Sequence, residues 1–179
     1  YSLSHYNFLE YSKLNFFISI LIYPLFGLFA IYNSNNFLFK RNKFKKMVID
    51  CKNSVIYKKY FVNIIKNISD KDLGKIGNDL DHDVSRDNFK LSHSVIITLI
   101  LIFTWPIAIL ISLILMKNYM QAIIRTLLVY FKTLNFFEIT PCDIYVTYED
   151  NKCSPAFYKA FKDSGGKLLV AIQNGHRVY

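Results

Sequence analysis

The chain has 179 residues, of which 53% are hydrophobic and 17% aromatic, and its 22 Lys and Arg against 13 Asp and Glu give a formal net charge of +9. This apolar content is high for a soluble domain and indicates membrane-embedded segments. Thirteen of the 22 basic residues lie between Lys40 and Lys90. Because this basic stretch borders apolar segments and no nucleic-acid recognition motif accompanies it, we expect membrane lipids as a partner and no nucleic acid. Three cysteines without C-x-x-C spacing predict neither a zinc site nor a disulfide framework.

The chain begins at Tyr1 and stops at Tyr179, just after a predicted strand, so we expect a fragment of a longer protein. After an N-terminal flank, 1–13, an uncharged apolar segment covers 14–32, near the shortest length that crosses a bilayer. Pro24 within it leaves a spanning helix and a re-entrant hairpin open. A cleaved signal peptide is a third interpretation. It is weakened because the sequence has no basic n-region and no small-residue cleavage site here.

A second uncharged apolar segment covers residues 95–116. As a helix it is about 33 Å long, enough to span a bilayer, so we expect a transmembrane helix. Residues 33–94 between the segments are predicted to be a basic polar loop with a helix over 45–68. Residues 117–140 have apolar positions at helical spacing and predict an amphipathic helix.

The polar loop also contains a group of acidic residues and a histidine that together invite a metal-site interpretation: Asp79, Asp81, His82, Asp83 and Asp87. Their spacing does not fit a calcium loop, because the required glycine and final glutamate are missing. We therefore interpret the group as a solvated turn and expect no metal and no other cofactor.

Residues 141–179 have the pattern of the start of an α/β domain. A strand is predicted over 143–148, a helix capped by Ser154 with Pro155 at its first position, and a second strand over 167–172. Strand, helix and strand in this order predict a βαβ unit. The expected fold is thus an α-helical membrane region, with two hydrophobic helices plus amphipathic helices, followed by the first βαβ unit of a Rossmann-like domain.

Polar residues follow both predicted strands, where parallel sheets bind ligands. The helix that begins at Ser154 would offer free backbone N–H groups to a phosphate. Arg177 could pair with the same anion, and His176 could act as acid or base. Asn-Gly turns and solvated strand ends are a plain alternative, since no glycine-rich phosphate loop is present. The candidate residues are Asp150, Asn151, Asn174, Gly175, His176 and Arg177.

Three short elements carry a resemblance: Asp143-Ile-Tyr-Val-Thr-Tyr-Glu-Asp-Asn151, Ser154-Pro-Ala-Phe-Tyr158 and Ile172-Gln-Asn-Gly-His-Arg177. Together they resemble the start of bacterial surface carbohydrate (capsule or lipopolysaccharide) biosynthesis proteins with a GT-B-like glycosyltransferase fold. The resemblance implies transfer of a sugar or related group from a nucleotide-sugar donor to a glycan acceptor. It implies that this N-terminal fragment holds an anchor and part of the acceptor-side half, and its matching positions are Asp150, Asn151, Asn174, His176 and Arg177.

The charge distribution raises a conflict over membrane sidedness. Thirteen basic residues place the 33–94 loop in the cytoplasm, so two full crossings would put the α/β unit outside. A nucleotide-sugar enzyme needs its donor from the cytoplasm, and re-entrant segments would remove the conflict. We expect an inner (cytoplasmic) membrane location with the α/β unit facing the cytoplasm. A non-enzymatic component of polysaccharide assembly or export, or a partner-binding protein, is the alternative, and a transporter or sensor subunit is a third.

Overall fold

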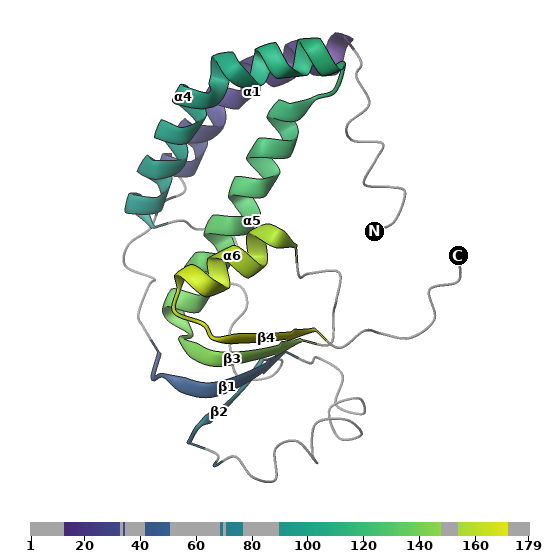
Figure 1. Cartoon of the computed structure of the whole chain (residues 1–179). Coiled ribbons are helices and arrows are strands. Elements are labelled where there is room, and N and C mark those ends of the chain that lie inside the picture. The colour runs from purple at the N-terminus through teal and green to yellow at the C-terminus, as the bar shows by residue number, and fades with distance from the viewer. Residues whose placement is uncertain are drawn as a thin grey trace, which may run out of the picture. The chain divides into compact units, whose positions relative to one another are not determined.

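A computed structural model describes residues 13–32, 34, 42–50, 69, 71–76, 90–147 and 154–171 (Figure 1). The chain divides into two compact units. One takes its residues from Tyr1–Phe39 and Ser85–Lys132, and the other from Lys40–Val84 and Thr133–Tyr179. Each unit is therefore built from two separate stretches of the sequence.

The first unit is helical and contains α1 (Lys13–Tyr32), α4 (Leu91–Leu115) and most of α5 (Tyr119–Ile139). The two helices expected over 95–116 and 117–140 are thereby confirmed as helices. α1 is one continuous helix that includes Pro24, so the chain does not turn back within the first apolar segment. Among the described residues, α4 is the one helix long and apolar enough to cross a membrane, and α1 contributes a shorter apolar stretch.

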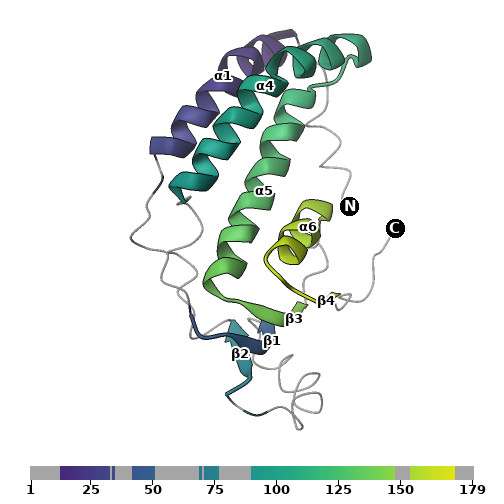
Figure 2. The same ribbon diagram turned by 60° about the vertical axis from the view of Figure 1, so that its left-hand side comes forward.

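α1 and α4 pack side by side and run in opposite directions (Figure 2). The order of their contacts shows this: the Ser94 hydroxyl donates to the Ala30 carbonyl oxygen at 2.8 Å, and the Thr98 hydroxyl donates to the Gly27 carbonyl oxygen at 3.1 Å. Further along, the hydroxyls of Tyr23 and Thr104 are 2.7 Å apart. A Cβ atom on Gly27 would lie 2.9 Å from Thr98 Oγ1, so the missing side chain is what allows this close approach.

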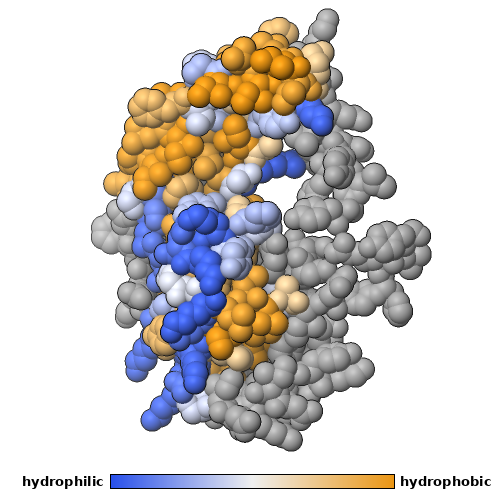
Figure 3. Space-filling model, in the orientation of Figure 1, coloured by the Kyte–Doolittle hydropathy of each residue, from blue (hydrophilic) through white to orange (hydrophobic). Residues whose placement is uncertain are grey.

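Small and polar residues are buried together with apolar ones on these two helices, whereas their outer surfaces are apolar. The buried positions of α1 are Phe16, Ser19, Tyr23, Gly27 and Ala30, which recur every three or four residues. The outward side chains include Leu21 at 67% exposure, Phe103 at 72% and Ile114 at 67%. Figure 3 shows this apolar surface over α1 and α4.

The second unit is built on a four-stranded sheet in the order β2-β1-β3-β4, in which every neighbouring pair is parallel. The strands are β1 (Lys45–Asp50), β2 (Leu73–Ile76), β3 (Cys142–Thr147) and β4 (Leu168–Ala171). β1 and β3 are therefore the two central strands. The mixed α/β fold class agrees with the expectation from the sequence.

The arrangement of this unit corrects two expectations. The helix expected over 45–68 is wrong at its start, because Lys45–Asp50 is strand β1, whose last four residues are buried between two neighbouring strands. Residues 51–68 lie outside the described part. The α/β unit also does not begin at 141, since β1 and β2 come from the stretch expected to be a polar loop. The helices α4 and α5 are thus inserted between strands of one sheet, and the α/β unit does not simply follow them.

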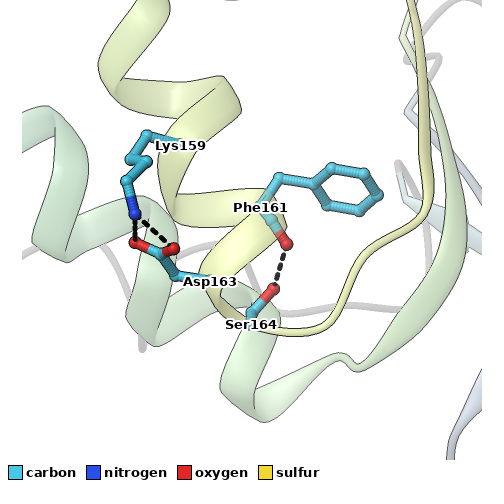
Figure 4. A network of polar contacts seen from close by, with 4 residues as sticks. All are labelled: Lys159, Phe161, Asp163 and Ser164. Atoms are coloured by element: carbon cyan, nitrogen blue, oxygen red, sulfur yellow. Dashed lines mark hydrogen bonds and ion pairs between the residues drawn. The ribbon is translucent and has the colours of Figure 1, made fainter.

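The predicted βαβ unit is confirmed as β3, α6 (Pro155–Asp163) and β4. Ser154 caps α6, its hydroxyl oxygen accepting from the Phe157 backbone N–H at 3.2 Å. At the C-terminal end of α6 the Ser164 hydroxyl donates to the Phe161 carbonyl oxygen at 2.7 Å. In the last turn of the same helix Lys159 forms an ion pair with Asp163, four residues further along (Figure 4). Gly165 then adopts a φ of +97°, which lets the chain turn into β4.

An aromatic core fills the space between this sheet and its helices. Phe137, in the last turns of α5, packs edge-to-face against Tyr145 of β3 and Phe161 of α6, with ring centroids 5.0 and 4.9 Å apart. Val48 of β1 is buried in the same cluster. Edge-to-face pairs of this kind each contribute about 0.5–1.5 kcal/mol beyond the burial of area. The cluster fixes β1, β3 and α6 relative to one another and so positions the ends of the strands.

Candidate functional site

The carboxyl ends of all four strands form one row. Ile76 is paired with Asp50, Asp50 with Thr147, and Thr147 with Ala171. We call this row the carboxyl edge. From β1 the chain continues to β2 on one side, whereas β3 and β4 lie on the other side, so the strand order reverses between β1 and β3. In open parallel sheets ligands bind outside the carboxyl ends at such a reversal.

Two polar residues are buried at this reversal. Asp50, the last residue of β1, has 6% of its surface exposed, and Thr147, the last residue of β3, is fully buried. The Tyr145 hydroxyl donates a 2.8 Å hydrogen bond to Oδ2 of Asp50. A buried carboxylate is costly unless hydrogen bonds compensate it, so this bond holds Asp50 in place. The geometry provides a fixed acceptor of hydrogen bonds at the carboxyl edge.

The first turn of α6 lies over the same part of β3. The rings of Phe157 and Tyr145 have centroids 5.8 Å apart, which brings the start of the helix beside the residue that holds Asp50. The N-terminus of a helix carries a partial positive charge and unpaired backbone N–H groups. The carboxyl edge therefore combines a carboxylate with a region that favours anions.

All six site residues predicted from the sequence lie outside the described part of the chain, in 148–153 and 172–179. The two predicted strands are neighbours in the sheet, with Thr147 paired to Ala171. The two stretches therefore start from adjacent positions of the carboxyl edge. The predicted residues are Asp150, Asn151, Asn174, Gly175, His176 and Arg177. The acidic group at 79–87 also falls outside the described residues.

Sequence reasoning missed Asp50, Tyr145 and Thr147 as a group. The signal for Asp50 was present, because Met47-Val48-Ile49 is a short apolar, β-branched run that ends in an aspartate. The scattered apolar positions in the residues that follow favour a helix over the same stretch. Only pairing with β3 identifies the run as a central strand and puts Asp50 beside Thr147.

Cys142 lies at the opposite end of β3 from the carboxyl edge and is buried. Burial raises the pKa of its thiol to about 12, and the negative charge of Asp143 adds to the increase. The thiolate is the reactive form, so this cysteine is inert near neutral pH. Within the described residues no three His, Cys, Asp or Glu side chains come close enough together to hold a metal ion.

Comparison with models of known protein families, with curated proteins and with solved structures found no match to this chain.

Proposed function

We propose that this chain is part of a membrane-anchored transferase of bacterial surface polysaccharide synthesis, which binds a nucleotide-activated sugar at the carboxyl edge. The observation that carries the proposal is the reversal of strand order between β1 and β3 with Asp50 buried at it. Doubly wound parallel sheets bind nucleotides at this position, whatever reaction they catalyse. The resemblance of 143–177 to surface carbohydrate biosynthesis proteins supports glycosyl transfer among the possible reactions.

Each part of the edge suits a different part of such a donor. The first turn of α6, capped by Ser154, favours a phosphate, and Arg177 is proposed to pair with it. Asp50 suits the hydroxyl groups of a ribose or sugar, because a carboxylate accepts hydrogen bonds and repels phosphate. His176 is proposed as the acid or base. Asp150, Asn151, Asn174 and Gly175 are proposed to line the same site.

The membrane anchor is proposed from the first unit. Only 22% of the most apolar stretch of α4 is buried, whereas the core helix of a soluble protein is mostly buried. Its hydrogen bonds to α1 include those from Ser94 to the Ala30 carbonyl oxygen and from Thr98 to the Gly27 carbonyl oxygen. Small residues and interhelical hydrogen bonds of this type are the usual means of helix packing within lipid. The outward apolar side chains are then in contact with lipid tails.

A binding measurement tests the donor site directly. The full chain, purified in lipid nanodiscs, is heated in the presence of UDP, GDP, dTDP or CMP, and one of these nucleotides should raise its melting temperature. Asp50→Asn should reduce this increase, whereas Asp163→Asn, which alters a carboxylate on the outer surface of α6, should leave it unchanged. If none of the nucleotides stabilises the protein, the donor-site proposal is wrong.

A genetic measurement tests the reaction. A strain that lacks the gene should lose a surface polysaccharide, and the wild-type chain should restore it. The double substitution of His176 and Arg177 by Ala should fail to restore it although the protein is present at normal level. Full restoration by that variant would instead favour a non-enzymatic component of polysaccharide assembly or export.

A further inference from the structure

β1 and β3 are hydrogen-bonded neighbours over most of their length, from Lys45 paired with Cys142 to Asp50 paired with Thr147. In the sequence, however, α4 lies between them. A bilayer cannot separate two paired strands, because the hydrogen bonds of a sheet link adjacent backbones about 4.8 Å apart. Both strands must therefore be on the same side of any membrane that α4 enters.

We infer that the chain between β2 and β3 returns to the side of the membrane from which it left, so that the residues before α4 and after α5 share one compartment. The inference rests on the membrane anchor of the proposed function. A single crossing by α4, which is what hydropathy alone suggests, would put β1 and β3 on opposite sides. Their pairing excludes that topology.

α5 is the segment that brings the chain back. In the continuously described stretch 90–147 it is the one helix between α4 and β3. A tight turn joins the two helices, with Met116 at a φ of 50° and the Tyr119 backbone N–H donating to the Ser112 hydroxyl at 3.1 Å. The rings of His93 and Phe131 are then 5.4 Å apart, so α5 runs antiparallel to α4 back to the first turn of that helix.

The stretch before α4 offers no second crossing. Residues 77–89 contain five charged side chains, which is incompatible with an apolar membrane span. The pairing of β1 with β3 requires an even number of membrane crossings between β2 and β3. α4 and α5 therefore form one insertion, which enters the membrane from the compartment that contains the sheet.

The charge pattern assigns that side. Thirteen basic residues lie between Lys40 and Lys90 and five more follow β3, so 18 of the 22 basic residues share the compartment of the sheet. Short segments rich in Lys and Arg next to membrane helices stay in the cytoplasm. The carboxyl edge then faces the cytoplasm, which removes the conflict between the charge pattern and a nucleotide donor.

Two single-cysteine variants of the full chain test this topology. Lys43→Cys lies just before β1 and Lys162→Cys lies on α6, and both positions are exposed. Cys51 and Cys153 are replaced by Ser, while Cys142 stays because it is buried and inert. A membrane-impermeant maleimide is applied to intact spheroplasts and to sealed inside-out vesicles. Both positions should be labelled in the vesicles and neither in the spheroplasts.

The controls separate the possible failures. The parent without either new cysteine gives the background from Cys142, and detergent-opened vesicles show that each introduced thiol can react. Labelling of the two positions from opposite faces overturns the inference, and so does labelling of both from the outer face. Release of the chain by alkaline carbonate would refute the membrane anchor itself, and with it the inference, but would leave the proposed donor site standing.

Discussion

The Tyr145 hydroxyl donates a 2.8 Å hydrogen bond to the carboxylate of Asp50, and the two residues are 95 positions apart in the sequence. Tyr145 belongs to the aromatic cluster that packs α6 and the end of α5 on the sheet, whereas Asp50 ends the neighbouring strand. The bond therefore links the hydrophobic core of the second unit to its candidate site. A change in the core is expected to reach the site through it.

Tyr145→Phe should lower the free energy of unfolding by about 1.5–3 kcal/mol, because a buried carboxylate loses a hydrogen-bond donor. The ring and its aromatic contacts remain, so the effect isolates the hydroxyl group. Denaturant unfolding in detergent measures it, with Tyr158→Phe as the control, since Tyr158 is 48% exposed on α6. Equal effects of the two substitutions would contradict the role assigned to this bond.

Gly27→Ala should weaken the packing of α1 on α4. The added Cβ would lie 2.9 Å from Thr98 Oγ1 and 3.0 Å from Thr98 Cα, which forces the helices apart. Overpacking of this kind costs about 1–3 kcal/mol, and here it also strains the hydrogen bond from Thr98 to the Gly27 carbonyl oxygen.

Thermal unfolding in detergent micelles measures this loss, with the neighbouring Leu28→Ala as the control. Leu28 is 60% exposed on the outer surface of α1, so its truncation should change the melting temperature little. A larger effect at Leu28 than at Gly27 would show that α1 is held by its outer surface.

The two adjacent glycines after α6 should respond differently to alanine. A Cβ on Gly166 would overlap the ring of Phe161, which is fully buried and cannot move aside. Gly165 has open space around it, so Gly165→Ala meets only the backbone strain of its φ of +97°, about 1–3 kcal/mol. Gly166→Ala should therefore lower the melting temperature more than Gly165→Ala. The reverse order would mean that the turn, and not the packing of Phe161, limits stability here.

Cys142 should make the protein less stable at high pH. Burial raises the pKa of its thiol to about 12 in the folded chain, above the ordinary value of 9.0 for an unfolded one. Between these values the unfolded chain loses a proton that the folded chain keeps, so stability falls as pH rises, by about 1.4 kcal/mol per pH unit. Below pH 9 both forms are neutral and the effect is absent.

The difference in unfolding free energy between wild type and Cys142→Ala, measured from pH 8 to pH 11, isolates this titration. The alanine variant is less stable at pH 8 because it leaves a small cavity, and the gap between the two proteins should narrow as pH rises. A gap that stays constant would show that the thiol is not the titrating group.

The local elements of this protein are determined by short-range patterns. Ser154 and Pro155 mark the start of α6, and the glycines at 165 and 166 its end, because capping and backbone freedom act within a few residues. The apolar segment that became α4 needed no more than its length and composition to be identified. Polar residues after β3 and β4 likewise marked the carboxyl edge, since the ends of parallel strands always meet there.

Only the tertiary structure decided which segments belong to one sheet. Lys45–Asp50 has apolar positions compatible with a helix or a strand, and no local feature distinguishes these two structures. This stretch becomes a central strand because it pairs with β3, which follows two inserted helices in the sequence. That pairing also brings Asp50 beside Thr147, and in the proposed membrane anchor it requires the α4–α5 insertion to return to its starting side. Strand pairing depends on contacts between residues far apart in the sequence, so neither the candidate site nor the proposed membrane topology could be read from local patterns alone.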